Sequence, residues 1–136
     1  EDLIARAKMC FMPENLEFLR AGGRVSNVAF LGAKLLNLHP VIEILDGKLV
    51  ATKKYRGKME NVYKQYVTDC VKDVNKIDTS RIVIANSGNI ESATLAFAKG
   101  LIEGKNKFDQ IIEADAGCTI SSHCGPKTLA VFYIRK

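Results

Sequence analysis

The stretch that decides the fold is Val41-Ile42-Glu43-Ile44-Leu45-Asp46-Gly47-Lys48-Leu49-Val50-Ala51-Thr52-Lys53-Lys54-Tyr55. Two strand-like runs flank the dipeptide Asp46-Gly47. This dipeptide favours the two-residue turn of a β-hairpin, because both turn positions need a positive φ. The stretch therefore predicts two antiparallel strands over 41–45 and 48–55.

Apolar spacing on either side of the hairpin predicts the other elements. Four further strands are expected, at 9–12, 81–86, 108–114 and 128–135. Helical patterns are seen at 2–8, 13–21, 26–37, 59–74 and 90–102. The order strand, helix, strand over 81–114 is that of a parallel crossover unit. We therefore expect an α/β fold, with helices packed on a mixed, largely antiparallel six-stranded sheet.

Length and composition predict one globular domain over residues 1–136. A chain of this length buries roughly two-thirds of its unfolded surface on folding, and its 47% hydrophobic content is ordinary for a globular protein. No apolar run approaches the roughly 18 to 20 residues that a membrane span needs, and the first residues do not resemble a signal peptide. The expectation is a soluble, cytoplasmic protein without stable membrane insertion.

The net charge of +5 favours anionic partners but does not identify one. Lys and Arg residues are scattered, no basic strip is interleaved with aromatic residues, and the chain has no Trp. Nucleic-acid platforms combine those features, so nucleic acid is not an expected partner.

The four cysteines, Cys10, Cys70, Cys118 and Cys124, include no Cys-x-x-Cys pair. Zinc ribbons and redox pairs use that spacing. Cys118, His123 and Cys124 lie within seven residues, but adjacent side chains point in different directions and a fourth ligand would have to come from elsewhere. Reduced, buried or half-buried thiols are therefore preferred to a zinc site, and no metal or cofactor is expected.

The motif Gly22-Gly23-Arg24-Val25-Ser26 follows a helical stretch. A glycine at a helix end is common, so one interpretation is a helix end, a tight corner and an exposed charge. Two adjacent glycines exceed what one cap needs, and the second permits a close backbone approach to another group. In the second interpretation, Arg24, Ser26 and free backbone N–H groups hold a carboxylate or a phosphate.

The motif Ser121-Ser122-His123-Cys124-Gly125-Pro126 has no flanking hydrophobic pattern and is predicted to be a loop between two strands. A loop histidine is more often structural than catalytic. Ser122 is adjacent to His123 in sequence, but neighbours seldom face one another and no Gly-x-Ser-x-Gly elbow is present. Nucleophilic catalysis is therefore disfavoured.

The stretch Tyr55-Arg56-Gly57-Lys58 places charge where a strand passes into a helix. A solvated strand end is the simpler interpretation. Basic groups at a helix N-terminus oppose the helix dipole, however. Docking of an anionic partner on Arg56 and Lys58 is the functional alternative.

Taken together and in this order, these motifs resemble the C-terminal domain of the DegV family of bacterial fatty-acid-binding proteins. The matching segments are Leu16 to Ser26, the passage Leu36-Asn37-Leu38-His39-Pro40-Val41 with Asp46-Gly47-Lys48-Leu49, Tyr55-Arg56-Gly57-Lys58, and His123-Cys124-Gly125-Pro126. The match spans nearly the entire chain. Lys127 and Ala130 stand where the family usually has glycine.

The resemblance implies a carrier that holds one long-chain fatty acid, with its tail in an apolar tunnel and its carboxylate at a cleft with an N-terminal DegV domain. That N-terminal domain is not in this sequence. The family pattern implies that His123 reaches the carboxyl group and that Arg24 lies near the head group. Gly22, Gly23 and Ser26 complete the expected ligand-binding set.

The resemblance also implies a protein partner. Some family members present the acid to a fatty-acid kinase for phospholipid synthesis, and Arg56 and Lys58 would belong to the basic face that meets the kinase. The tail needs apolar walls, for which the candidates are Phe30, Leu31, Leu35, Ile42 and Ile44.

The expected function is therefore a non-enzymatic, fatty-acid-binding carrier. The alternative is a phosphoryl- or acyl-transfer enzyme that uses Arg24 and His123. A zinc-binding or nucleic-acid module ranks behind both.

Overall fold

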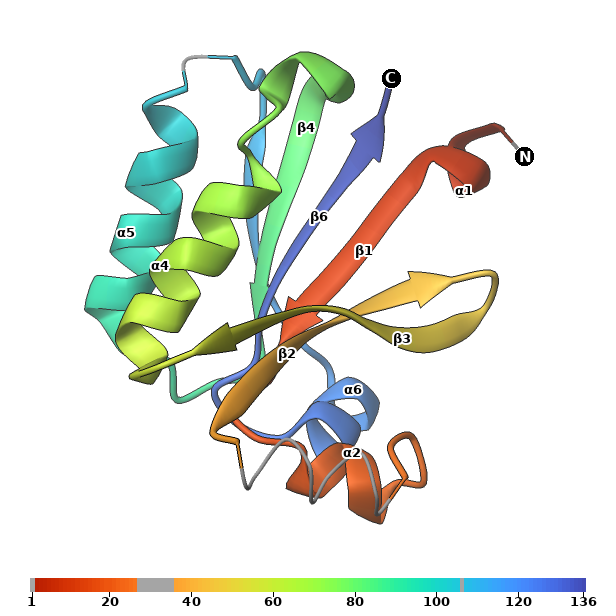
Figure 1. Cartoon of the computed structure of the whole chain (residues 1–136). Coiled ribbons are helices and arrows are strands. Elements are labelled where there is room, and N and C mark those ends of the chain that lie inside the picture. The colour runs from red at the N-terminus through yellow and green to blue at the C-terminus, as the bar shows by residue number, and fades with distance from the viewer. Residues whose placement is uncertain (1, 27–35, 106) are drawn as a thin grey trace.

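The computed structural model describes residues 2–26, 36–105 and 107–136. These residues form an α/β fold with one six-stranded sheet in the order β3-β2-β1-β6-β4-β5 (Figure 1). The strands are β1 (Ala7–Met12), β2 (Leu38–Leu45), β3 (Lys48–Arg56), β4 (Ile77–Asn86), β5 (Ile111–Asp115) and β6 (Leu129–Arg135). The helical elements are α1 (Asp2–Arg6), α2 (Glu17–Ala21), α4 (Met59–Cys70), η1 (Val74–Lys76), α5 (Ser92–Glu103) and α6 (Cys118–Cys124).

The predicted hairpin is confirmed as β2 and β3. They pair antiparallel, with Leu45 opposite Lys48. Asp46 and Gly47 have φ values of 49° and 74°, the left-handed values that the two-residue turn needs. Because β3 lies at the edge of the sheet, the hairpin extends away from the other strands (Figure 1).

The parallel crossover is also confirmed. The chain passes from β4 through α5 to β5, and β4 pairs parallel with β5. Every other strand pairing is antiparallel. The sheet is therefore mixed and largely antiparallel, as expected.

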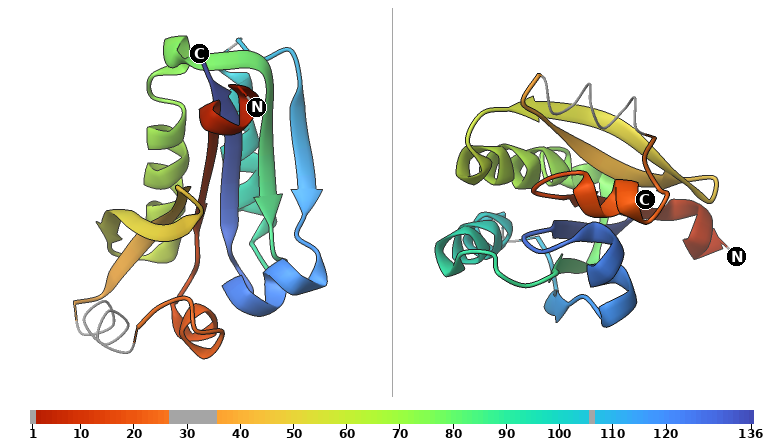
Figure 2. Two further views of the ribbon diagram at one scale, coloured as in Figure 1. Left: turned by 90° about the vertical axis from the view of Figure 1, so that its right-hand side faces the viewer. Right: turned by 90° about the horizontal axis from the view of Figure 1, so that it is seen from below.

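The main hydrophobic core lies between the sheet and the helices α4 and α5, which pack side by side on one face (Figures 1 and 2). Val62, Tyr66 and Val67 of α4 are 1% exposed or less, as their three- and four-residue spacing predicts. The Tyr66 hydroxyl donates to the Cys10 carbonyl of β1 at 2.8 Å and accepts from the Val131 N–H of β6 at 3.1 Å. Tyr66 thus ties α4 to both central strands.

A smaller cluster of Leu16, Leu19 and Ile42, with Phe11 and Val25 against it, forms where α2 meets the hairpin. Val41 belongs to the main core and its neighbour Ile42 to this cluster. Since successive strand side chains point to opposite faces, the small cluster lies on the sheet face that α4 and α5 leave uncovered.

The structure corrects one element and adjusts others. Residues 118–124 form a helix, α6, and not the expected loop, so His123 lies in the last turn of a helix. Helix α2 begins only at Glu17. β4 begins at Ile77, four residues before the prediction. The helix predicted from Ser26 to Asn37 lies for the most part outside the described residues. None of the described helices is long and apolar enough to cross a membrane.

Candidate functional site

The first glycine motif ends α2. Gly23 has φ of 73°, its N–H donates to Arg20 O at 2.9 Å, and the Arg24 N–H donates to Leu19 O at 2.7 Å. These two bonds define a Schellman cap. The Gly22 and Val25 N–H groups also donate to α2 carbonyls. The prediction that free backbone N–H groups at this corner hold an anion is therefore wrong for these four groups.

Gly22 lies directly against His123. A Cβ atom added at Gly22 would be 2.4 Å from His123 Nδ1 and 3.1 Å from Cε1. The two adjacent glycines thus have different tasks: Gly23 supplies the positive φ of the cap, and Gly22 makes room for the imidazole. The close approach was expected at the second glycine, and the structure places it at the first. The structure brings together two predicted site residues about a hundred positions apart in sequence.

A second contact joins the same two helices, with the glycine now at the end of α6 and the ring on α2. Gly125, at the C-cap of α6, lies under the ring of Phe18, and a Cβ added there would be 2.4 Å from Phe18 Cδ2. The motif that ends α2 therefore packs against a ring of α6, and the motif that ends α6 packs against a ring of α2. Without a side chain at Gly22 and Gly125, α2 and α6 can approach closely.

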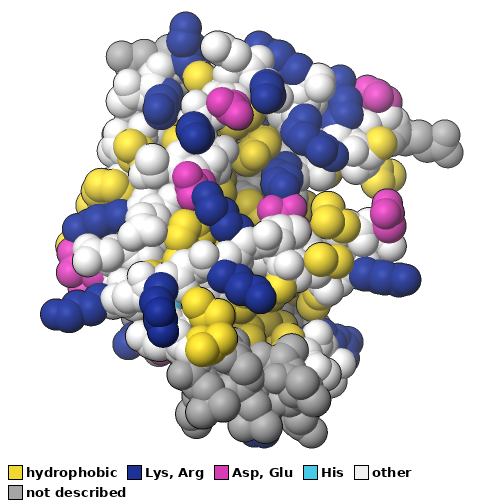
Figure 3. All heavy atoms as spheres, in the orientation of Figure 1, with side chains coloured by type: hydrophobic (Ala, Val, Ile, Leu, Met, Phe, Trp, Pro, Cys, Tyr) yellow, Lys and Arg dark blue, Asp and Glu magenta, His cyan; other side chains and the backbone are white. Residues whose placement is uncertain are grey.

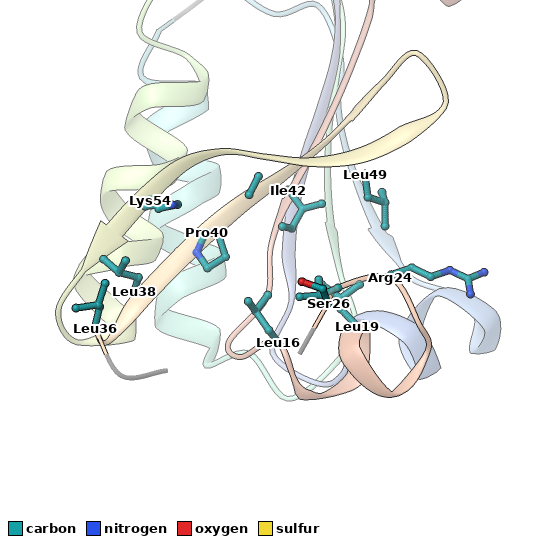
Figure 4. Close-up of a pocket in the computed structure, with 12 residues that line it drawn as sticks. Leu16, Leu19, Arg24, Ser26, Leu36, Leu38, Pro40, Ile42, Leu49 and Lys54 are labelled. Carbon is teal, nitrogen blue, oxygen red and sulfur yellow. The ribbon is translucent and has the colours of Figure 1, made fainter. Parts of the chain in front are cut away.

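A cavity of about 410 Å³ lies between α2 and the β2–β3 hairpin (Figure 4). Its walls combine the end of α2, the residues that follow it, the start of β2 and the middle of β3. It is lined by Leu16, Leu19, Arg24, Val25, Ser26, Leu36, Leu38, Pro40, Ile42, Leu49, Ala51 and Lys54. All of these residues are apolar except Arg24, Ser26 and Lys54. The cavity has the size and lining of a small-molecule site.

An irregularity in β3 decides which lysine faces the cavity. Ile42 is paired with Ala51, and Val41 with Lys53, so one residue of β3 is left without a partner. Such a bulge shifts the alternation of side chains. As a result Lys54 lines the cavity, while Lys53 points to the other face and forms an ion pair with Asp69 of α4.

The polar lining residues occupy different parts of the cavity. The Ser26 hydroxyl lies among the apolar side chains, whereas the Arg24 guanidinium points away from them (Figure 4). Arg24 Nη1 donates to the carbonyl of Gly22 at 2.6 Å. Arg24 thus stands at the rim of the cavity, on the same corner against which His123 packs.

The other predicted site residues lie outside the cavity lining. His123 is half-buried against Gly22 and is not a lining residue. Arg56 and Lys58 are exposed, and Lys58 is the N-cap residue of α4. Arg56 follows Lys54 by two positions and pairs with the lining residue Leu38. Strand alternation therefore places it on the cavity face of β3.

The expected wall residues are only partly tested. Phe30, Leu31 and Leu35 lie outside the described residues. Ile42 lines the cavity as expected, but Ile44 does not. Sequence reasoning missed the walls built by Leu16, Leu36 and the bulged strand. The sequence did contain a signal for the strand wall. Leu49 and Ala51 are two positions apart in the strand after the Asp46-Gly47 turn, so they share one face of that strand.

Other site types find little support in the described part of the chain. It contains no group of three His, Cys, Asp or Glu side chains arranged to hold a metal ion. Cys118 is exposed and Cys124 is buried, and both are free thiols. On the face shown in Figure 3, Lys and Arg side chains are spread over the surface and do not form one strip.

Comparison with known proteins identifies relatives over the full length of the chain. The DegV family model, described as "Uncharacterised protein, DegV family", matches residues 1–136. A DegV domain-containing protein of Streptococcus pyogenes is 35% identical over 136 residues, which cover 98% of this chain and 45% of that protein. The chain thus spans about half the length of the curated relatives it matches.

Solved structures agree with this result. A DegV family protein of Thermus thermophilus, described as binding fatty acid, is 27% identical with a TM-score of 0.74, over 97% of this chain and 46% of that one. The Fatty Acid Kinase (Fak) B3 protein of Streptococcus pneumoniae, described as loaded with linoleic acid, has the same fold, with a TM-score of 0.79 at 21% identity over 98% and 46% of the two chains. From the family match over all 136 residues and these shared folds, we conclude that the chain belongs to the DegV family.

Proposed function

We propose that this chain is the lipid-binding part of a fatty-acid carrier, and that the cavity between α2 and the hairpin holds the acyl tail. The observation that carries the proposal is the lining of that cavity, which is apolar except for Arg24, Ser26 and Lys54. A site built for a polar metabolite would place several convergent polar groups on its walls.

The tail supplies most of the affinity in this proposal. Each methylene removed from water contributes about 0.8 kcal/mol, and the walls around Leu19, Ile42 and Leu49 offer no competing hydrogen bonds. The 27% identical Thermus thermophilus protein, which is described as binding fatty acid, supports this ligand class.

The carboxylate is assigned to the end of the cavity that Arg24 and Ser26 line, with Arg24 at the rim and Ser26 inside it. A carboxylate leaving water needs a cation or hydrogen-bond donors, and a guanidinium offers paired donors that match its geometry. The Ser26 hydroxyl is a further donor inside the cavity. His123 packs on Gly22 at the same corner.

Two macromolecular partners belong to the proposal. The chain covers 45% of its Streptococcus pyogenes relative, so an N-terminal DegV domain is proposed to close the head-group cleft. A fatty-acid kinase is proposed to receive the acid on the basic face of β3 and the start of α4, where Arg56 and Lys58 are exposed. The carrier itself then performs no chemistry, and we place it in the cytoplasm.

Native mass spectrometry tests the proposal directly. The chain is expressed in bacteria in two forms, alone and joined to the N-terminal half of the Streptococcus pyogenes relative. The expected result is one long-chain fatty acid bound per protein in at least the joined form, identified by gas chromatography after extraction. An empty protein that also takes up no added palmitate overturns the carrier function, and turnover of an acyl phosphate by that empty protein favours the transferase.

Arg24→Ala and Ser26→Ala in the joined form test the head-group assignment. Loss of one charge-assisted hydrogen bond, worth roughly 1.5–3 kcal/mol, should weaken binding on the order of tenfold or more. Arg135→Ala is the matched control, because Arg135 donates to the Ala5 and Arg6 carbonyls, close to the first residues of the chain. Equal affinity in all three variants would remove Arg24 and Ser26 from the site.

A further inference from the structure

Two cysteines distant in sequence meet between the central strand and α4. Cys10 of β1 and Cys70, the last residue of α4, have their Sγ atoms 3.7 Å apart. Cys10 is 2% exposed, and Cys70 is half-buried. The sequence predicted buried thiols but gave no reason to pair these two, because sixty positions separate them.

Both thiols border a second cavity, of about 230 Å³, distinct from the proposed lipid site. It lies on the α4 side of the hairpin, and Lys8, Glu43, Tyr55 and Tyr66 also line it. Lys8 and Glu43 form an ion pair there. This cavity is large enough for a small polar molecule to reach the two sulfur atoms.

The surroundings lower the pKa of the Cys10 thiol, whose sulfur also lies 3.4 Å from the Val131 carbonyl oxygen. The hydrogen bond with the neighbouring Cys70 thiol is the largest cause of the lowered pKa, and it outweighs burial, which raises the pKa. The Tyr66 hydroxyl, whose proton points to the Cys10 carbonyl, also lies 3.4 Å from Cys10 Sγ and lowers the pKa of the thiol. The Glu43 carboxylate raises this pKa and the Lys8 ammonium lowers it. Proximity to Cys10 and burial raise the pKa of Cys70. The thiolate is the reactive form of cysteine.

We propose that Cys10 and Cys70 form a thiol-oxidation site that reacts with a hydroperoxide and closes into a reversible disulfide between β1 and α4. With hydrogen peroxide, the Cys10 thiolate attacks one peroxide oxygen, the O–O bond breaks as an OH group joins the sulfur, and the other oxygen leaves as hydroxide and takes up a proton to become water; an organic hydroperoxide releases an alcohol at this step instead. The Cys70 thiol then attacks the Cys10 sulfenic acid, its proton passes to the departing hydroxide, and a second water is released. Two thiols are oxidised and one peroxide is reduced.

The geometry of the pair supports the second step. The sulfur atoms need to approach by about 1.7 Å to reach the length of a disulfide bond, and rotations of the two side chains can supply such a shift. The closed bond would join residues 60 positions apart. A disulfide across a long loop restricts the unfolded chain, so oxidation should raise the unfolding temperature. A cellular thiol reverses the reaction by exchange.

The experiment uses the Cys118→Ser/Cys124→Ser variant, which retains only the proposed pair. One equivalent of hydrogen peroxide should lower its intact mass by about 2 Da, and digestion should yield one linked peptide pair that contains Cys10 and Cys70. Dithiothreitol should restore the original mass. The oxidised form should also unfold at a higher temperature than the reduced form.

Two further variants separate the pair from general oxidation. Adding Cys70→Ser, at a half-buried position, should leave a Cys10 sulfenic acid that dimedone traps and no internal link. The converse variant, with Cys10→Ala, should react with peroxide much more slowly. The proposal is overturned if the two-cysteine variant gains oxygen without a link, or keeps its mass while exposed Cys118 of the unmodified chain is oxidised.

Discussion

Gly22 and His123 are in direct contact, so close that a Cβ atom on residue 22 would lie 2.4 Å from the imidazole Nδ1. This contact joins the C-terminal end of α2 to the last turn of α6, and with it the two glycine-rich motifs of the sequence. It fixes the corner that carries Arg24 at the rim of the cavity. The proposed head-group site therefore depends on a packing relationship as well as on charge.

Gly22→Ala should lower the free energy of unfolding by about 1–3 kcal/mol, the usual cost of forcing extra volume into a packed contact. Adding His123→Ala should return part of that loss, because the clash disappears with the ring. Urea unfolding of the single and double variants measures the coupling. Gly100→Ala in α5 is the control, since a Cβ added there meets no atom within 4 Å beyond its chain neighbours and the backbone of its own helix. Additive effects of the two substitutions would contradict the contact.

Tyr66→Phe should lower the free energy of unfolding by about 1–3 kcal/mol, because the Cys10 carbonyl and the Val131 N–H both lose their buried partner. Tyr55→Phe is the comparison. Its hydroxyl donates to Asp69, and that carboxylate retains the Lys53 ion pair and access to water. A smaller loss is expected there. Equal losses would mean that the two buried hydrogen bonds of Tyr66 stabilise the fold no more than the single hydrogen bond of Tyr55 to Asp69.

Asp69 should make stability depend on acid pH. Burial raises the pKa of its carboxyl group, but hydrogen bonds from Lys53 and Tyr55 outweigh burial and leave that pKa lowered. The resulting stabilisation is complete above the unfolded value of about 3.9 and is lost as the pH falls through the lower folded value. Asp69→Asn should therefore be less stable than the unmodified chain at pH 7, with a gap that narrows below about pH 4. Urea unfolding of both proteins between pH 7 and pH 3 measures this difference in stability. A difference that does not change with pH would contradict a stabilising role of the Asp69 carboxylate.

Ala51→Phe should block the proposed acyl site. Ala51 lines the cavity from an exposed strand, so the larger side chain should fill part of it with little effect on stability. A loss of two or three buried methylenes, at about 0.8 kcal/mol each, corresponds to an affinity lower by at least tenfold. Val50→Phe is the matched control, because adjacent strand residues point to opposite faces. Isothermal titration of delipidated protein with palmitate gives the comparison, and equal affinities would place the tail elsewhere.

The sequence predicted the parts of the fold that local chemistry decides. Asp46-Gly47 determines its turn without help from the rest of the chain, and the long amphipathic pattern from Met59 determines α4. Helix α6 was missed because Thr, Ser and His leave residues 118–124 without a regular apolar spacing. Its packing on α2, through Gly22 and Gly125, is a tertiary effect that a local pattern does not contain.

The candidate site was predicted in outline only. Gly22, Arg24 and His123 were singled out, and the structure places them at one corner. The resemblance gave them roles, but the residues alone did not separate a helix cap from an anion site, and the cap proved to use the backbone donors. The position of Lys54 on the cavity wall depends on a bulge in β3, and such an irregularity leaves little trace in the alternation of one strand.

The most direct test of the central claim is isotope-filtered nuclear Overhauser spectroscopy with carbon-13-labelled palmitate bound to the chain joined to its N-terminal domain. We predict contacts from the acyl methylenes to the methyl groups of Leu19, Ile42 and Leu49, which line the cavity. Val67 and Ile102, buried in the main core on the other face of the sheet, should show none. Acyl contacts to Val67 and Ile102 in place of the cavity residues would contradict the account.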